Sequence, residues 1–502
     1  MNLVPRLALV LFIAFGIGSA GAQPKPDHSP HPPQQQSPPN GKGVLRLLPA
    51  DSVTEHSVDT AQGRLAYSAT AGTLPFYDQS GEQSAAVFYV AYVAKDRAPN
   101  RPLTFVFNGG PGAASAFLNL GLVGPRHLAL GPEAHGAANA KLVDNPNTWL
   151  AFTDLVLVDP IGTGWSRTVK PDDGKNFWSV RSDADAMAKA IALYVARNNR
   201  AGAPIYLLGE SYGGFRAAKT ANALKRQQGI AIDGIVMLSP LLEGWLTFGD
   251  DQSALRAALQ LPSLAATHLE TTKSFTPQAL AAAETFALGD YLSTLAGPPL
   301  QGEAAHAFYE RVAKLSGLPV ETVAQARGFV TGGVLKSLSE GKVVSSYDAT
   351  FAVDDPFPEQ RGSRGPDPIL DGMVRAYGGA FAAYARNELG FKTEMTYTLL
   401  ASDIAGHWDW GGTGRADAGV DSDLRVLLSF SPSFRLLIGS GVSDLVTPYA
   451  QTRYVLDHLP PTNPPGRAVL KTYRGGHMLY LDPQSRKAFT ADAAAYYKAG
   501  AN

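Results

Sequence analysis

A serine between closely spaced glycines is the first feature of the chain that could do chemistry, in Gly-Glu-Ser-Tyr-Gly at residues 209–213. Residues 205–208 before it are apolar, and a helix is expected from Phe215 to about Lys225. A strand, a sharp turn and a helix form the setting of a nucleophile elbow, in which small neighbours let a strained serine project its hydroxyl above a sheet. The stretch predicts that Ser211 is a nucleophile, although so short a pattern also arises by chance.

A histidine and an aspartate that could activate this serine come late in the chain. Asp444 follows the strand-like residues 434–439, and His477 follows 469–473. The order Ser, Asp, His, with each residue after its own strand, is typical of an α/β-hydrolase triad. We predict that Ser211, Asp444 and His477 form such a triad.

The roles within this triad follow from side-chain chemistry. A serine hydroxyl is a weak nucleophile until a base takes its proton. Imidazole titrates near neutrality, so His477 can take that proton and return it to a leaving group, while a buried carboxylate fixes the ring tautomer. An aspartate after a strand is also a common turn former, so Asp457 and Asp403 remain reserve candidates for the acid.

Consecutive glycines follow an earlier apolar strand, in Asn-Gly-Gly-Pro-Gly at residues 108–112. Glycines at this place let backbone N–H groups approach a substrate oxygen closely. We predict that the N–H groups of Gly110 and Tyr212 form the oxyanion hole. An ordinary tight turn is the alternative for this stretch.

The elements that must position these residues alternate between strands and helices in the first half of the chain. The strands are near-continuously apolar, which is typical of a parallel sheet covered on both faces. We predict an α/β core of residues 43–240 and 421–502, with a mainly helical cap, residues 241–420, inserted between its strands. The expected strands are 65–70, 85–93, 103–107, 155–159, 205–208, 234–238, 434–439 and 469–473, and the expected helices include 181–199, 277–295, 303–316, 368–389 and 484–498.

Taken together, Asn-Gly-Gly-Pro-Gly, Gly-Glu-Ser-Tyr-Gly-Gly and Gly-Gly-His-Met resemble the motifs of the serine carboxypeptidase family of α/β hydrolases. Residues 144–149 and 159–166 also resemble the family's sequence between its first loop and its nucleophile. The resemblance covers roughly 85–240 and 420–495. It implies the α/β-hydrolase fold and hydrolysis of the last peptide bond of substrates with a free C-terminus.

The resemblance also implies that Asn108 and Glu210 recognise the terminal carboxylate of the substrate. Glu210 can hydrogen-bond a carboxylate only when it is protonated, and two close carboxylates raise one pKa and share a proton. Activity is therefore expected to be favoured at acidic pH. A buried structural glutamate beside the elbow is the alternative for Glu210.

Three residues depart from the usual pattern of that family. Phe107 stands where the family often has Trp, and Ala113 stands where it often has Cys, which removes a disulfide. Leu122 falls where a further Glu would usually join the carboxylate-binding residues. An esterase or acyltransferase of the same fold is therefore the first alternative function. A catalytically silent binding protein is the second, and the intact triad argues against it.

The N-terminal residues predict export. A basic residue precedes apolar residues 7–17, and small residues end at Ala22, as in a signal peptide cleaved after that residue. The apolar run is shorter than the ~20 residues that span a bilayer. Residues 23–42 are expected to be a disordered linker in which His28 and His31 are solvated. The mature protein is expected in the periplasm or the medium, with no membrane attachment beyond the signal peptide.

Composition excludes several other classes of protein. The 502 residues include 43 Lys plus Arg and 44 Asp plus Glu, a balance that predicts no nucleic-acid partner. Cysteine is absent, which excludes a thiol nucleophile, and no metal-binding or nucleotide-binding motif occurs, so no metal and no cofactor is predicted. Trp408 and Trp410 are expected to pack within the cap rather than line a pocket. Nothing in the sequence predicts the oligomeric state.

Overall fold

The computed structural model describes residues 41–95, 98, 100–130, 140–331, 338, 341–359, 365–412 and 414–500. The predicted signal peptide and residues 23–40 of the predicted linker therefore lie outside the described residues. Among the helices of the described residues, none is long and apolar enough to cross a membrane.

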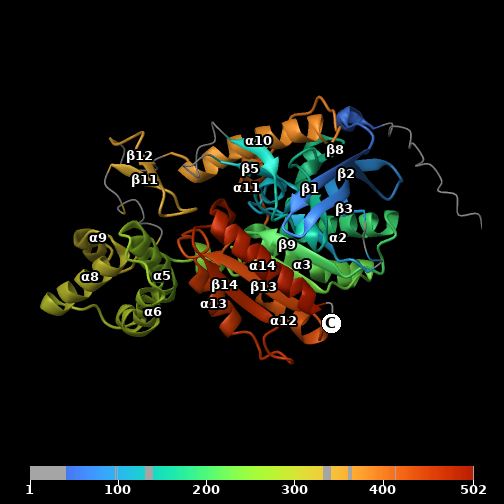
Figure 1. Ribbon diagram of the computed structural model, residues 1–502. Helices are drawn as coiled ribbons and strands as arrows, with labels where there is room; N and C mark the ends of the chain where they lie inside the picture. Colours follow the sequence, from blue (N-terminus) through green and yellow to red (C-terminus); the bar gives the residue numbers. More distant parts are fainter. Residues whose placement is uncertain are drawn as a thin grey trace, which may run out of the picture. The chain divides into compact units, whose positions relative to one another are not determined.

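A ten-stranded mixed sheet organises the chain (Figure 1). Its main order is β1-β2-β3-β7-β4-β9-β10-β13-β14, and β8 pairs with β3. The strands from β1 to β7 pair antiparallel, and those from β7 to β14 pair parallel. The strands are β1 (Ser52–Thr60), β2 (Gly63–Tyr77), β3 (Gln83–Ala94), β4 (Leu103–Phe107), β7 (Asp154–Val158), β8 (Arg167–Thr168), β9 (Ile205–Glu210), β10 (Gly234–Leu238), β13 (Arg435–Gly441) and β14 (Ala468–Tyr473).

The central strands are apolar on both faces, and the pleat sends alternate side chains into two different cores. Phe105 of β4 and Leu207 of β9 belong to one cluster of buried residues, whereas Val106 and Leu208 belong to the other. Every residue of β4 and β9 is buried. The continuous apolar runs of the sequence therefore correspond to strands that are covered on both sides.

The strand register brings the carboxyl ends of the parallel strands to one edge of the sheet. Phe107 at the end of β4 pairs with Gly209, and Leu238 at the end of β10 pairs with Glu210. The ends of β13 and β14 meet in the same way. Residues that follow these strands consequently gather at one edge, which is where sites in such sheets form.

Helices cover the sheet on its two faces. The helix α3 (Tyr212–Ala223) contacts α2 (Val180–Arg197) and α12 (Asp421–Phe430), while α13 (Tyr449–Asp457) contacts β14 and α14 (Pro483–Gly500) contacts β13 (Figure 1). A twisted, mostly parallel sheet between helices, with a serine elbow after β9, is the α/β-hydrolase fold. The predicted fold class is confirmed.

The chain between β10 and β13 is mostly helical. Its helices α5 (Ala254–Thr271), α6 (Pro277–Phe286), α7 (Leu292–Ala296) and α8 (Gly302–Ser316) share a hydrophobic cluster, and α10 (Pro368–Asn387) packs against the second core of the sheet. The expected helix 277–295 is interrupted, because Gly289 has non-helical φ/ψ angles between α6 and α7. The helix α5 and two short hairpins, β5–β6 (Arg126–Ala129, Lys141–Asp144) and β11–β12 (Lys342–Val344, Ala352–Asp354), were not expected from the sequence.

Candidate active site

Ser211 occupies a strained turn between β9 and α3. Its φ of 60° and ψ of −127° lie in a region that non-glycine residues rarely adopt. The glycines around it are required by contact: a Cβ at Gly209 would lie 2.0 Å from the carbonyl oxygen of Gly213, and a Cβ at Gly213 would lie 2.6 Å from that of Phe107. The helix α3 begins at Tyr212, three residues earlier than expected, because Ser211 itself occupies the position before the first helical turn.

Asp444 and His477 form a buried pair after β13 and β14. The Nδ1 atom of His477 lies 2.8 Å from Oδ2 of Asp444, and the two residues are 2% and 0% exposed. Burial alone would lower the pKa of His477, but the charge and hydrogen bond of Asp444, together with the nearby carboxylates of Glu210 and Asp367, raise that pKa above its ordinary value. The reserve candidates Asp457 and Asp403 make no hydrogen bond to His477 within the described part of the chain. The structure therefore pairs the imidazole with Asp444.

Both oxygens of Asp444 accept several hydrogen bonds. Oδ1 accepts from the backbone N–H groups of Val446 and Thr447 at 2.8 and 3.0 Å. Oδ2 accepts from the hydroxyl of Thr447 at 2.9 Å and from His477. Because Nδ1 of the imidazole faces Asp444, Nε2 is the ring nitrogen left for a nucleophile.

The loop after β4 lies directly against the serine elbow. A Cβ at Gly109 would lie 2.7 Å from the backbone nitrogen of Tyr212 and 2.9 Å from the Cβ of Ser211, so only glycine allows this approach. Gly110 has a φ of 100°, which also favours glycine. Tyr212 is the first residue of α3, where a helix leaves the backbone N–H without an intrahelical partner. The backbone of Gly109 and the N–H of Tyr212 therefore lie close together beside Ser211.

Asn108 and Glu210 form a second polar pair in the same place. The side-chain amide of Asn108 donates to Oε2 of Glu210, and its carbonyl oxygen accepts from the N–H of Leu118 at 3.0 Å. Glu210 is 4% exposed. Burial raises the pKa of Glu210 to about 7. The nearby imidazole and the hydrogen bonds favour the charged form and lower that pKa, but burial has the larger effect. Its proton is therefore available close to neutral pH.

Tyr480 also contacts the pair of Asn108 and Glu210, and the sequence did not predict it. Its hydroxyl donates to both carboxylate oxygens of Glu210 at 3.2 Å. Leu122, where the resemblance leads one to expect a glutamate, is fully buried in the core beside it. A Cβ at the neighbouring Gly121 would lie 2.5 Å from the ring of Tyr480. A tyrosine thus supplies the third polar group at this carboxylate. The only sequence signal is its position three residues after His477.

A buried ion pair contacts the backbone of the Asn108 loop. The guanidinium of Arg216 in α3 donates to Asp183 in α2 at 2.7 Å and to the backbone carbonyl of Asn108. Arg216 and Asp183 are 1% and 4% exposed. The elbow helix, its neighbouring helix and the glycine loop are therefore fixed to one another by groups that are costly to separate.

One cavity contains most of the predicted site residues. Asn108, Gly110, Glu210, Ser211 and His477 all line it. The predicted cap contributes to the same cavity through its residues 347, 370 and 400. Asp444 and Tyr212 lie behind this surface, each buried.

The aromatic residues near the end of the cap sit elsewhere. The rings of Trp408 and Trp410 pack edge-on against Tyr212, with centroids 5.3 and 5.4 Å away. Neither tryptophan lines the catalytic cavity. They support the elbow helix from the cap side.

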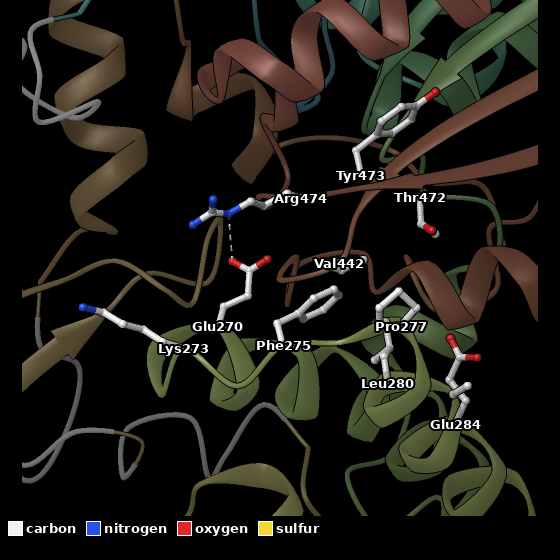
Figure 2. A pocket seen from close by; sticks show the side chains of 11 residues that line it. Glu270, Lys273, Phe275, Pro277, Leu280, Glu284, Val442, Thr472, Tyr473 and Arg474 are labelled. Carbon is white, nitrogen blue, oxygen red and sulfur yellow. Dashed lines mark ion pairs between the residues drawn. The ribbon is translucent and has the colours of Figure 1, made fainter.

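A larger cavity lies between the helices α5 and α6 and the ends of β13 and β14 (Figure 2). Phe275, Leu280 and Val442 form its apolar part, and Glu270 pairs with Arg474 at 3.6 Å on its rim. None of the predicted site residues lines it. Among the described residues, no group of three or more His, Cys, Asp or Glu side chains could hold a metal ion.

Comparisons with known proteins find similarity to serine carboxypeptidases over part of the chain. The family model described as serine carboxypeptidase matches residues 65–245. Serine carboxypeptidase-like 29 of Arabidopsis thaliana is 30% identical over 148 residues, which cover 29% of this chain and 29% of the relative. The pheromone-processing carboxypeptidase KEX1 of Cryptococcus gattii is 30% identical over 164 residues, 31% of this chain and 23% of the relative. The chain thus matches less than a third of the length of these relatives.

The fold has a counterpart among solved structures. The crystal structure of KEX1(delta)p, a prohormone-processing carboxypeptidase from Saccharomyces cerevisiae, superimposes with a TM-score of 0.55 and 15% identity. The superposition covers 86% of this chain and 91% of that one. At this identity the likeness is one of fold, and it extends well beyond the segment that the family model matches.

Proposed function

We propose that this chain, whose residues 65–245 match the serine carboxypeptidase family model, hydrolyses the C-terminal peptide bond of peptides. Ser211 attacks the carbonyl carbon of that bond, and Nε2 of His477 takes the hydroxyl proton. Asp444 holds the imidazole in the required tautomer and stabilises its charge. The N–H groups of Gly110 and Tyr212 stabilise the oxyanion of the tetrahedral intermediate.

Collapse of that intermediate completes the first half of the reaction. His477 returns the proton to the nitrogen of the leaving group, which departs as the free C-terminal amino acid. The remaining peptide is then an ester of Ser211. A water molecule, deprotonated by His477, attacks this acyl-enzyme, and the shortened peptide and free Ser211 are released.

Recognition of the C-terminus is assigned to Asn108 and Glu210. The amide of Asn108 is a donor, and Glu210 becomes a donor when it carries its proton, which its pKa of about 7 makes accessible. Both can then donate hydrogen bonds to the terminal carboxylate of the substrate. The observation that carries the proposal is that this pair lines one cavity with Ser211 and His477.

A second function is kept because of Leu122. Its apolar side chain takes the place of a carboxyl group that the resemblance associates with C-terminal recognition. An esterase or acyltransferase would use the same triad with a substrate that has no free carboxylate. The two functions differ in what the Asn108 and Glu210 pair contributes.

Two measurements test these functions. Fluorophosphonate labelling should modify the wild type and not Ser211→Ala, and that variant should lose about 10⁴- to 10⁶-fold in kcat. Blocked dipeptides with free and amidated C-termini should then be compared at one pH. A higher kcat/KM for the free acid supports the carboxypeptidase, and equal values would favour the esterase or acyltransferase.

Export and the boundaries of the cap belong to the same proposal. Residues 1–22 direct the chain out of the cytoplasm, and the mature enzyme acts in the periplasm or the medium on peptides. Residues 241–420 form the cap and the flanking segments form the core. N-terminal sequencing of the exported protein should begin at Gln23, and an intact Met1 in that fraction would contradict the proposed cleavage.

A further inference from the structure

A short segment outside the catalytic core, residues 345–349, contacts the loop of Asp444 on both sides of that residue. On one side, the N–H of Leu445 donates to the carbonyl of Ser346 at 3.0 Å. On the other side, the backbone carbonyl of Ser443 accepts from the N–H of Ala349 at 3.2 Å. The hydroxyl of Ser443 donates to the carboxylate of Asp348 at 2.8 Å. The peptide units that flank Asp444 are therefore tied to one segment.

The same segment contacts the loop of His477. The backbone N–H of His477 donates to the carbonyl of Tyr347 at 2.5 Å. The ring of Tyr347 stands edge-on to the imidazole, with centroids 5.0 Å apart and planes at 77°. A Cβ at Gly476 would lie 1.9 Å from the carbonyl oxygen of Tyr347, so glycine before the histidine is required by this contact.

Asp367 fixes the segment at its start. Its carboxylate accepts from the hydroxyl of Ser345 at 2.8 Å and from the backbone N–H and hydroxyl of Ser346 at 2.7 and 3.0 Å. The same carboxylate caps the helix α10 by accepting from the N–H groups of Ile369 and Leu370. Ser345 is fully buried.

These contacts connect two loops that follow different strands. We propose that residues 345–349 act as a strap that positions Asp444 and His477 relative to Ser211, and that Asp367 and Tyr347 are positioning residues acting through it. The inference rests on the proposed function. Its physical basis is that the acid and the base must stay in line with the nucleophile, and small displacements of catalytic groups are expensive in rate.

The strap assigns a catalytic task to the predicted cap. Tyr347 also lines the cavity that contains Ser211, so one residue supports the imidazole and forms part of the substrate site. The α/β core alone supplies the two loops, and the strap sets the distance between them. A change in this segment should consequently alter kcat more than substrate binding.

The decisive variant is Asp367→Asn. Asparagine caps helices as well as aspartate does, and its remaining oxygen can still accept from Ser345. Its amide nitrogen cannot accept from Ser346, so the strap loses the two hydrogen bonds from Ser346 to residue 367 while α10 keeps its cap. We expect kcat to fall by about 10- to 100-fold. KM should stay within about twofold, because groups that bind the substrate equally in ground and transition states are untouched.

A second pair of variants tests the ring. Tyr347→Ala removes the edge contact with the imidazole, whereas Tyr347→Phe keeps it. We expect the phenylalanine variant to retain about tenfold more kcat than the alanine variant. The matched control is Asp371→Asn on the same helix, where the carboxylate pairs only with Arg375 among the described residues. It should have wild-type kcat.

Steady-state kinetics on one blocked dipeptide, with thermal melting for each variant, separates the outcomes. Two results with an active wild type would overturn the strap. One is an unchanged kcat in Asp367→Asn, and the other is an equal loss of kcat in Asp367→Asn and Asp371→Asn. A loss confined to KM would do the same. A wild type that neither cleaves peptides nor reacts with a fluorophosphonate would overturn the proposed function, and this inference with it.

Discussion

The two carboxylates at the site are held in different ways. Asp444 accepts hydrogen bonds from two backbone N–H groups, one hydroxyl and the imidazole. Within the described part of the chain, Glu210 accepts from only two side chains, Asn108 and Tyr480. It is buried with a pKa raised to about 7. The first arrangement suits a group that remains an acceptor throughout catalysis, and the second suits a group that gains a proton to become a donor.

This difference divides the site into two halves. In the proposed function, the half that contains Asp444 and His477 takes part in bond making and breaking, whatever the substrate. In the proposed function, the half that contains Asn108 and Glu210 recognises one particular group, the terminal carboxylate of the substrate. Variants in the first half should change kcat for every substrate, and variants in the second should matter only when the substrate has a free C-terminus.

Among variants of these two carboxylates and their partners, the largest effect is expected for Asp444→Asn. Asparagine keeps the volume, but its amide nitrogen favours the wrong tautomer of His477, so kcat should fall by about 10⁴-fold for free and amidated substrates alike. The matched controls are Asp457→Asn and Asp403→Asn, which make the same chemical change at the two reserve candidates. Both controls should keep wild-type kcat. A loss of activity at either one, with none at Asp444, would reverse the assignment of the acid.

The residues of this site that the sequence predicted are those that come immediately after the end of a strand. The Asn108 loop, the Ser211 elbow, Asp444 and His477 each come just after an apolar run, and a parallel sheet brings such positions to one edge. The family model matches residues 65–245 only, so Asp444 and His477 depended on the order and spacing of later motifs. The structure brings all of them together.

The parts that the sequence did not predict are partners set by tertiary packing. Tyr480 meets Glu210 across 270 positions of the chain, and Arg216 meets Asn108 across 108. The strap lies in a stretch without a readable motif, where only the packed fold brings Tyr347 to His477. The missed helix α5 contains Pro262 in its interior, and a proline at such a position argues against a continuous helix when only the sequence is read.

The next largest effect is the pH dependence of kcat/KM that is expected from Glu210. In its proposed role, the carboxyl of Glu210 binds a substrate carboxylate only when it is protonated, and burial raises its pKa to about 7. The kcat/KM of free-acid substrates should therefore fall as pH rises above 7, by about tenfold per pH unit. Amidated substrates should lack this decrease, since they present no negative charge. Both should lose activity at lower pH, where His477 becomes protonated.

Glu210→Gln isolates that group. Glutamine is a donor at every pH, so the decrease above pH 7 should disappear for the free acid while the loss at low pH remains. Full pH profiles of the wild type and of Glu210→Gln, each on the free acid and the amide, provide the measurement. If the wild-type pH profiles for the free acid and the amide coincide, Glu210 does not recognise the terminal carboxylate and is a structural residue.

The smallest effect is expected for Tyr480→Phe. The tyrosine hydroxyl stabilises the charged form of Glu210, so its removal should raise the pKa of that carboxyl further. A hydrogen bond of about 0.5–1.5 kcal/mol corresponds to a shift of ~0.5–1 pH unit, which should move the decrease in free-acid kcat/KM to higher pH. The matched control is Tyr377→Phe, because the Tyr377 hydroxyl is equally buried and has no hydrogen-bond partner among the described residues. That variant should leave the profile in place. A shift to lower pH, or equal shifts in both variants, would mean that Tyr480 acts by packing against the Gly121 turn rather than by donating to Glu210.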